Sequence, residues 1–273
     1  MKDNVFLYAA FMCPVAAGVA YMALAGAPHS YLFANMAAAC LVLVAFWLVP
    51  PLDRQAALLA ISVFVPALLA STFLGPAVDG VHRWIGIGPL KMHAGFLVLP
   101  FLATRMPRLD RWVVAAIISL AALLIALQPD RASAFALFLL AVVWFGIARN
   151  RWALMAFLAS GGGLLWTISQ ADNLPPVRFV ENVVAEAAAA DRGMAVVMVG
   201  ATLLAIAVPI SIWWRNRSAR GVGLIFWSIC LAGYFLASLA GPYPVPLLGY
   251  GVSPILGFGY ALALLARERN QAR

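Results

Sequence analysis

Apolar runs that end at charged residues, Pro or Gly follow one another along the chain. Many are close to the roughly 20 residues that a helix needs to cross a bilayer, and several are shorter. The pattern predicts an all-α polytopic membrane protein with about ten transmembrane helices. The expected spans are residues 5–27, 31–49, 56–75, 90–103, 112–127, 132–148, 152–168, 194–214, 222–239 and 252–266.

The composition argues against a soluble protein. Of the 273 residues, 65% are hydrophobic and only 10% are charged, and the mean hydropathy is +0.96. A soluble domain carries roughly 25% charged residues. Because the few charged side chains of this sequence cannot coat a globule of its size, we expect most of the outer surface to face lipid.

The positions of the charged residues predict the orientation. With ten spans and a cytoplasmic N-terminus, thirteen of the 18 Lys and Arg residues fall in inner segments, and six of the 10 Asp and Glu residues fall in outer ones. This bias follows the positive-inside rule and places both termini in the cytoplasm. The net charge of +8 is then explained by topology and by attraction to anionic membrane lipid. The basic residues are scattered in short loops, so no nucleic-acid partner is expected.

The residues that commonly bind metals or cofactors form no recognisable pattern. Cys13, Cys40 and Cys230 lie within expected spans and are interpreted as small buried apolar residues. The three His residues lack the spacing of a helical metal pair. No phosphate-binding loop is present, and "SGGG" at 160–163 suits close helix packing or a hinge. We therefore expect no cofactor and no metal site; a divalent cation is compatible with the sequence, although no residue pattern indicates one.

The chain reads as a single integral membrane domain over residues 1–273, without a tandem repeat or a low-complexity linker. Its longer polar stretches are residues 76–89, 169–193 and 241–251, and all three lie on the outer side in the predicted topology. The inner loops are short and basic. The function is therefore expected to face outward.

The first outer stretch contains "DGVHRWIGIG", in which Arg83 and Trp84 stand among three glycines. One interpretation is an interfacial anchor, with the ring in the headgroup layer and the guanidinium reaching water or lipid phosphate. The other is a phosphate-binding site, because Arg presents a fixed fork to phosphate oxygens and Gly lets the backbone approach a ligand. The local sequence leaves both open.

Four stretches, in the same order along the chain, resemble the SEDS (shape, elongation, division, sporulation) family of RodA/FtsW/SpoVE-like proteins. Residues 79–88 resemble the family's G-x-R-R-W-I-x-x-G. Residues 127–134, "LQPDRASA", resemble Q-P-D-L-G-T-A. Residues 160–163 followed by "LP" resemble G-S-G-G-L…L-P, and 244–256, "PVPLLGYGVSPIL", resemble P-L-P-F-L-S-Y-G-G-S-S-L-L. The resemblance implies a SEDS-like bundle in the bacterial cytoplasmic membrane.

The resemblance also implies an activity and a set of contacts. Family members polymerise cell-wall glycan (peptidoglycan) from undecaprenyl-pyrophosphate-linked disaccharide, lipid II, and work with a penicillin-binding transpeptidase. The expected substrate-binding residues of this chain carry the motifs or flank them. They are Arg83 and Lys91 as pyrophosphate contacts, Trp84 and Gln128 as further substrate contacts, and Asp130 with Arg131 lining the site. Alternatively, Asp130 pairs with Arg131 or caps the span that begins near residue 132.

Two family signatures are altered. Where members read Q-P-S-E-x-x-K, a gapless count reaches His93, Ala94, Gly95, Phe96 and then Leu99, so the Glu and the Lys are both missing. Where members carry the catalytic Asp of T-D-F-I-F-A-V-I-x-E-E-L-G, this chain reads "RFVENVVAEAAAADRG" at 178–193. Counting from either side places Asn182 or Val180 at that Asp. The expected catalytic carboxylate is therefore absent.

Two nearby carboxylates are candidate replacements for this base, namely Glu181 and Glu186. A helix over 180–187 would leave both, together with Asn182 as a substrate contact, on its polar side. The alternative is that they are solvated loop acids on an interfacial helix. The expected apolar face of the helix consists of Val180, Val183, Val184 and Ala187.

Two classes of function remain open at this point. One is an outward-facing glycosyltransferase that polymerises the lipid-linked precursor. The other is a non-catalytic relative that binds such a lipid or serves as a partner subunit in division or elongation. A translocator of the precursor is a third alternative, but the scarcity of charged residues within the spans argues against an ion-coupled carrier.

Overall fold

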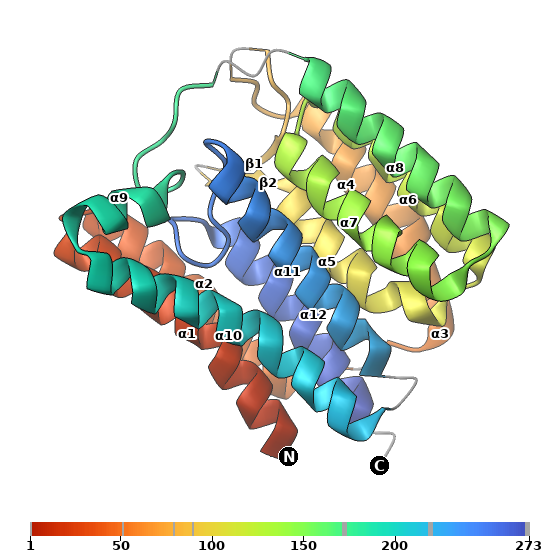
Figure 1. The fold of residues 1–273 in the computed structure, drawn as a ribbon, viewed down its shortest axis with the longest axis horizontal. Coiled ribbons are helices and arrows are strands. Elements are labelled where there is room, and N and C mark those ends of the chain that lie inside the picture. The colour runs from red at the N-terminus through yellow and green to blue at the C-terminus, as the bar shows by residue number, and fades with distance from the viewer. Residues whose placement is uncertain are drawn as a thin grey trace.

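The computed structural model describes residues 2–50, 52–78, 80–88, 90–170, 174–217 and 221–270. Helices form almost all of the regular structure, and they pack side by side in one bundle (Figure 1). Seven of the described helical segments are long and apolar enough to cross a membrane, and helix α6 is a shorter apolar one. The predicted all-α polytopic membrane fold is thereby confirmed.

The helices follow the expected apolar runs, and one of them is built from several pieces. Pro66, which has no N–H to donate, lies in the third run, and the backbone just before it forms a π-turn. In the first half of the chain the elements are α1 (Lys2–Leu24), α2 (His29–Leu48), α3 (Arg54–Leu59), η1 (Ala60–Phe64), α4 (Val65–Ser71), η2 (Thr72–Leu74), β1 (Trp84–Ile87), β2 (Leu90–His93), α5 (Ala94–Arg105), η3 (Met106–Arg108) and α6 (Arg111–Leu127). In the second half they are α7 (Arg131–Ala148), α8 (Arg151–Ser169), α9 (Val183–Ala190), α10 (Arg192–Asn216), α11 (Val222–Ala240) and α12 (Val252–Asn270).

The fourth expected span needs a correction at its start. Residues 90–93 form strand β2, which pairs antiparallel with β1, and the helix begins only at Ala94. Gly88 adopts a positive φ of 57° in the connecting turn, which Gly accepts without strain. An apolar run gives little information on whether its first residues extend a helix or pair as a strand. Helix α5 is therefore only 12 residues long, and the count of ten spans stays a prediction.

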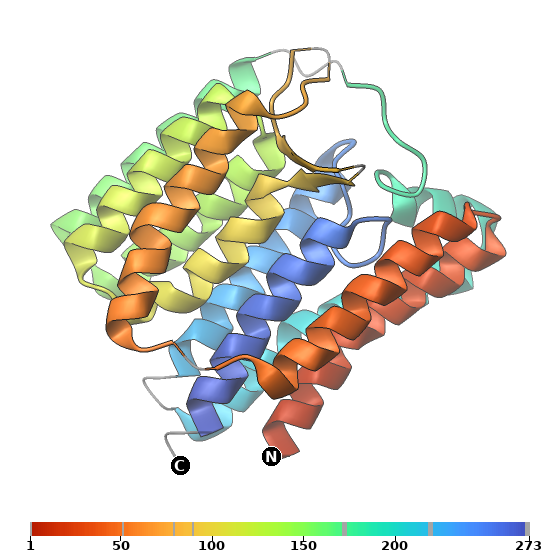
Figure 2. The same ribbon diagram turned by 180° about the vertical axis from the view of Figure 1, so that it is seen from behind.

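The centre of the bundle consists of α5, α11 and α12. Helices α4, α6, α7 and α8 lie on one side of it, and α1, α2 and α10 lie on the other (Figures 1 and 2). Small residues allow the close contacts. A Cβ at Gly257 of α12 would lie 1.9 Å from the Phe96 carbonyl oxygen of α5, and one at Gly233 of α11 would lie 2.8 Å from the Ala136 Cα of α7. Such contacts are typical of helix packing in membranes.

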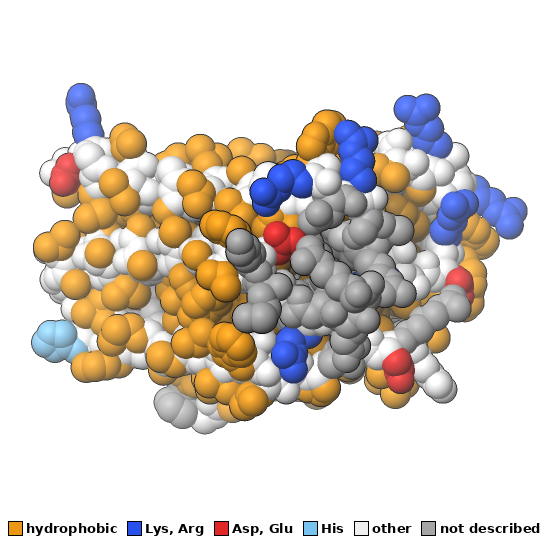
Figure 3. All heavy atoms as spheres, turned by 90° about the horizontal axis from the view of Figure 1, so that it is seen from below, with side chains coloured by type: hydrophobic (Ala, Val, Ile, Leu, Met, Phe, Trp, Pro, Cys, Tyr) orange, Lys and Arg blue, Asp and Glu red, His pale blue; other side chains and the backbone are white. Residues whose placement is uncertain are grey.

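The start of α1 and the end of α12 lie at the same end of the bundle (Figure 1). We call this the inner end, because the charge bias assigns it to the cytoplasm, and we call the opposite end the outer end. Lys and Arg side chains are visible among apolar ones when the molecule is seen from below (Figure 3). Having both ends of the chain on one side fits the predicted topology, whereas the cytoplasmic assignment stays a prediction.

The cysteines differ from expectation in part. Cys230 is buried in α11, as predicted. Cys13 and Cys40, by contrast, are exposed on α1 and α2. Both face outward from the protein on apolar helices, so they are surface residues of the bundle. Apolar composition within a span does not distinguish a face that contacts other helices from one that contacts lipid.

Candidate functional site

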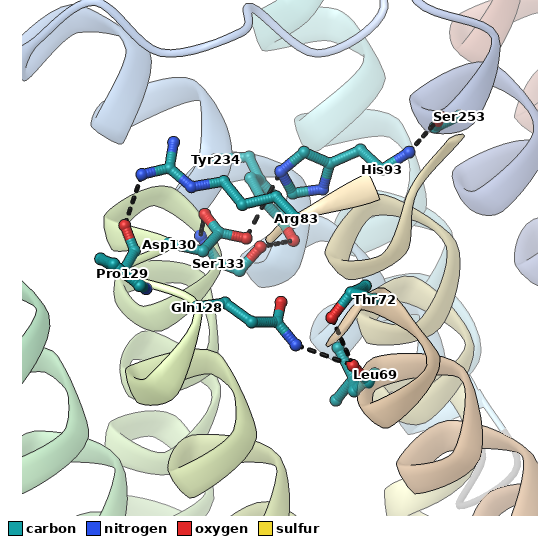
Figure 4. A network of polar contacts seen from close by, with 10 residues as sticks. All are labelled: Leu69, Thr72, Arg83, His93, Gln128, Pro129, Asp130, Ser133, Tyr234 and Ser253. Carbon is teal, nitrogen blue, oxygen red and sulfur yellow. Dashed lines mark hydrogen bonds and ion pairs between the residues drawn. The ribbon is translucent and has the colours of Figure 1, made fainter. Parts of the chain in front are cut away.

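Arg83 lies just before strand β1 and turns into the protein. Its side chain is buried, with the whole residue only 6% exposed, and its Nη2 donates a hydrogen bond to the Pro129 carbonyl oxygen in the turn between α6 and α7 (Figure 4). The guanidinium therefore joins the β1–β2 hairpin to the start of α7. Because the Arg83 side chain points into the protein, it does not act as an interfacial anchor directed toward lipid.

Asp130 stands at the centre of this region and is 2% exposed. Its Oδ1 accepts a hydrogen bond of 3.1 Å from the Ser133 backbone N–H, so Asp130 is the N-cap of α7. This is the capping role that the sequence offered as one alternative for Asp130. Its Oδ2 lies 3.4 Å from the Nε2 of His93. This Oδ2 has no hydrogen-bond partner among the described residues, so the carboxylate caps the first turn of α7 and faces the end of strand β2 through an electrostatic contact alone.

Arg131 does not pair with Asp130, which corrects the other alternative. Its guanidinium reaches instead to the last turn of α8, where Nε donates to the Thr167 carbonyl at 3.1 Å and Nη2 donates to the carbonyls of Ile168 and Gln170. Carbonyl groups at a helix C-terminus lack intrahelical partners and carry partial negative charge. A structural role as a cap of α8 therefore accounts for the position of Arg131.

His93 is central to this region, although its sequence context predicts neither a metal ligand nor a substrate contact. It is 8% exposed, and its backbone N–H donates to the Ser253 hydroxyl at 2.9 Å. His93 is the last residue of β2 and lies outside helix α5. Burial lowers the pKa of its imidazole below 6.5, whereas Asp130 raises it and Arg83 lowers it further. The ring is therefore expected to be neutral at physiological pH.

Polar contacts continue from Asp130 into the bundle. The Ser133 and Tyr234 hydroxyls lie 2.8 Å apart, which connects α7 with α11. Gln128, 1% exposed, donates from Nε2 to the Leu69 carbonyl of α4 at 2.8 Å (Figure 4). We call this set of side chains the hairpin network. Its members are Arg83, His93, Gln128, Asp130, Ser133 and Tyr234.

Two more predicted contacts lie on the hairpin itself. Trp84 in β1 pairs with His93 in β2, and their rings are nearly perpendicular with centroids 6.4 Å apart. Lys91 pairs with Gly86 in the ladder, and it is exposed. Trp84 therefore adjoins the hairpin network, whereas the Lys91 side chain lies at the surface.

The two candidate bases of the second outer stretch, residues 169–193, lie away from the hairpin network. Helix α9 begins at Val183 and not at residue 180, so Glu181 precedes it. The Glu181 Oε2 accepts a 3.0 Å hydrogen bond from the Val177 backbone N–H, and residue 181 forms a β-bridge with Pro244. Because residue 181 pairs with the stretch at 241–251, helix α9 starts three residues later than expected. Val183 and Ala187 are fully buried, in agreement with the predicted apolar face.

Glu186 lies in the first turn of α9 and is half-buried. Its Oε2 is shielded from solvent and has no hydrogen-bond partner among the described residues. The nearby Tyr21 of α1 interacts with Glu186 both electrostatically and through a side-chain hydrogen bond, and it also interacts with Arg178. Of the two candidate bases, Glu186 is the one with an uncommitted, shielded oxygen.

A cavity of about 450 Å³ lies between α9 and the C-terminal end of α11. Asn182 lines it, in a left-handed conformation at the N-cap of α9. Within the described part of the chain, no lining residue carries a carboxylate, and neither Arg83 nor Asp130 reaches the cavity. The other lining side chains include Val184, Ser238, Leu239, Pro242 and Val245.

Comparisons with known proteins were made on sequence and on structure. No family model matches the chain, and no curated protein matches its sequence. An aspartate-to-alanine mutant of the rod shape determining protein RodA from Thermus thermophilus superposes with a TM-score of 0.71 at 20% identity, covering 100% of this chain and 98% of that chain. This chain has the fold of RodA. The unmutated RodA gives 0.68 at 20% identity over 100% and 98% of the two chains.

A third solved structure, described as a peptidoglycan synthase complex that coordinates polymerization and crosslinking, has a chain that matches with a TM-score of 0.59 at 19% identity. The match covers 99% of this chain and 98% of that one. The SEDS-like bundle that four short motifs predicted is thus the fold found.

Within the RodA-like fold, the predicted site residues form two separate groups. Arg83, Trp84, Gln128 and Asp130 gather around the hairpin network, whereas Glu181, Asn182 and Glu186 lie near α9 and its cavity. Across the described residues, no three His, Cys, Asp or Glu side chains are grouped so that they could hold a metal ion.

Proposed function

We propose that this protein takes part in bacterial cell-wall synthesis in the cytoplasmic membrane and binds an undecaprenyl-diphosphate-linked disaccharide, lipid II, at its outer end. The observation that carries the proposal is the full-length likeness to RodA, together with the gathering of Arg83, Gln128 and Asp130 in one outer network. These residues come from the motifs that suggested the family. A diphosphate suits a buried guanidinium, which forms charge-assisted hydrogen bonds to phosphate oxygens.

The first candidate activity is polymerisation of the precursor. A base removes the proton of the acceptor sugar hydroxyl, the oxygen attacks the anomeric carbon of the donor, and the diphosphate leaves with the bonding electron pair. Glu186 is our preferred base because one of its oxygens is shielded and has no hydrogen-bond partner within the described chain. Glu181 is second, since its Oε2 already accepts from the Val177 N–H.

The second candidate is a non-catalytic role as a precursor binder, a translocator or a partner subunit. It is favoured by the cavity beside α9, whose described lining offers Asn182 but no carboxylate. A neutral amide cannot act as the base. The likeness to a chain of a peptidoglycan synthase complex supports a crosslinking enzyme, a penicillin-binding transpeptidase, as the partner for either role.

The test is glycan polymerisation from purified lipid II by the full chain in nanodiscs, with and without a co-purified transpeptidase. We expect Glu186→Gln to lower the rate by about 100-fold or more, the contribution of a positioned base. Glu181→Gln tests the second carboxylate. Asp191→Asn is the control, because Asp191 is exposed in the same outer stretch and Asn can still cap α10.

Binding of lipid II is measured on the same samples. Saturable binding without polymerisation, with the transpeptidase present, would select the non-catalytic role. Failure to bind lipid II at all would overturn the proposal. Activity unchanged in both the Glu181→Gln and Glu186→Gln variants would remove these carboxylates as bases but leave the binding claim standing.

A further inference from the structure

Three charged side chains meet inside the inner end of the bundle, at the opposite end of α5 from His93. Arg105 ends α5, Arg108 ends η3, and both donate hydrogen bonds from Nη1 to the carboxylate of Glu268 in α12. Arg105 is completely buried and Glu268 is 7% exposed. The contacts connect segments about 160 residues apart in the sequence.

The charges of this cluster do not balance. Two guanidinium groups share one carboxylate, which leaves one positive charge in excess. The groups that act on Arg105 are Glu268, Arg108 and the phenol of Tyr260. Among the described residues, Nε and Nη2 of Arg105 and Nη2 of Arg108 have no hydrogen-bond partner, although all three are shielded from solvent.

A buried excess of one sign of charge is unfavourable, and unsatisfied buried donors are rare in folded proteins. An anion bound at the cluster would neutralise the excess charge and accept hydrogen bonds. Of the two Arg side chains only that of Arg108 is partly exposed, at 25%, so an anion would approach the cluster from the side of Arg108. Arg105 lies behind it and contributes through its charge.

The cluster lies at the level where headgroups are expected. Three Trp residues are largely exposed near the inner ends of three different helices, which is the position of an aromatic belt at a membrane–water interface. Trp112 begins α6, four residues after Arg108, and is 58% exposed. The other two are Trp47 in α2, 67% exposed, and Trp214 in α10, 60% exposed.

We infer that Arg108 and Arg105 form a binding site for the phosphate group of an anionic phospholipid of the inner leaflet. Basic pockets between helices on the cytoplasmic side are suited to such headgroups, and Arg matches the geometry of phosphate oxygens. The position beside a Trp-rich interface favours a lipid phosphate over a dissolved one. This site is independent of the outer end and of the proposed function.

The test is native mass spectrometry of the detergent-purified full chain, titrated with phosphatidylglycerol or with phosphatidylcholine. We expect a saturable site that prefers phosphatidylglycerol, and Arg108→Gln should weaken it by roughly tenfold, which is about 1.4 kcal/mol. Arg149→Gln is the matched control, since Arg149 is an exposed cation at the same end in the loop after α7. Its effect should stay near twofold, the scale of an exposed charge.

A second variant keeps the inference testable if Arg108→Gln folds poorly. Glu268→Gln removes the carboxylate that competes with the lipid, so its melting temperature should fall in phosphatidylcholine and be largely restored by phosphatidylglycerol. Equal losses in both lipids, or equal weakening by Arg108→Gln and Arg149→Gln, would refute the site. Stabilisation by inorganic phosphate as large as that by phosphatidylglycerol would overturn the assignment to a lipid headgroup.

Discussion

Replacing Asp130 should separate two contacts that one carboxylate makes at the outer end. Its Oδ1 caps α7 through the Ser133 N–H, and its Oδ2 faces the His93 imidazole at 3.4 Å. Loss of an N-cap to Ala costs about 1 kcal/mol, and loss of a buried polar contact, here the approach of Oδ2 to the His93 ring, costs roughly 1–3 kcal/mol more. We therefore expect Asp130→Ala to lower the free energy of unfolding by about 2–4 kcal/mol.

Asp130→Asn should be much milder. Its amide oxygen can still accept from the Ser133 N–H, because Asn is as good an N-cap as Asp. Its amide can also offer a polar group to a neutral His93 ring, whose pKa is lowered by burial. We expect a loss of about 1 kcal/mol or less.

The assay is denaturant unfolding in detergent micelles, with Asp191→Ala as the matched control. Asp191 caps α10 through the N–H groups of Gly193 and Met194, and it is exposed, so its loss reports the cap alone. The difference between Asp130→Ala and Asp191→Ala then measures the buried contact with His93. Equal losses in these two variants, or equal losses in Asp130→Ala and Asp130→Asn, would show that the hairpin network does not hold α7 to the hairpin.

Three further predictions concern contacts elsewhere in the bundle. Gly257→Ala should lower the free energy of unfolding by about 1–3 kcal/mol or more, because the new Cβ would lie 1.9 Å from a backbone carbonyl oxygen of α5. Gly162→Ala is the control in the same unfolding assay, and it should be neutral or stabilising because the space around Gly162 is open. Arg131→Gln should raise hydrogen exchange in the last turn of α8, since three carbonyls there lose their donor, with no matching rise in α7. Asn35→Ala should increase protease cleavage within 241–251, because the Asn35 side chain donates a hydrogen bond to the Gly249 carbonyl and accepts one from the Gly251 N–H. Unchanged cleavage would contradict that role.

Much of the fold follows from the sequence because lipid imposes few solutions. Long apolar runs must be helices when they cross a bilayer, and the charge bias indicates which loops share an end. The starting residues of α5 and α9 could not be predicted in this way. Residues 90–93 are apolar enough for a span, but pairing with β1 makes them a strand, and the bridge from residue 181 to Pro244 delays the start of α9.

The candidate site was predictable only where motifs marked it. Arg83, Gln128 and Asp130 belong to motifs, and the structure brings them together. The position of His93 in the hairpin network could not be predicted, because its partners Asp130 and Ser253 lie 37 or more residues away and the residues on either side of it are apolar. The Arg105–Glu268 contact spans 163 residues, and nothing local to either residue indicates it.

The stretch at 241–253 connects the two outer groups. The backbone N–H of Tyr250 donates to the Phe179 carbonyl just before α9, and the Ser253 hydroxyl accepts from the backbone N–H of His93. The N–H of Val245 also donates to the carbonyl of residue 180. The spacing between the hairpin network and the α9 carboxylates is thus set by one Pro-rich segment at the entry of α12. Residues of this motif therefore fix how the hairpin network and the carboxylates near α9 are placed relative to one another, although they belong to neither group.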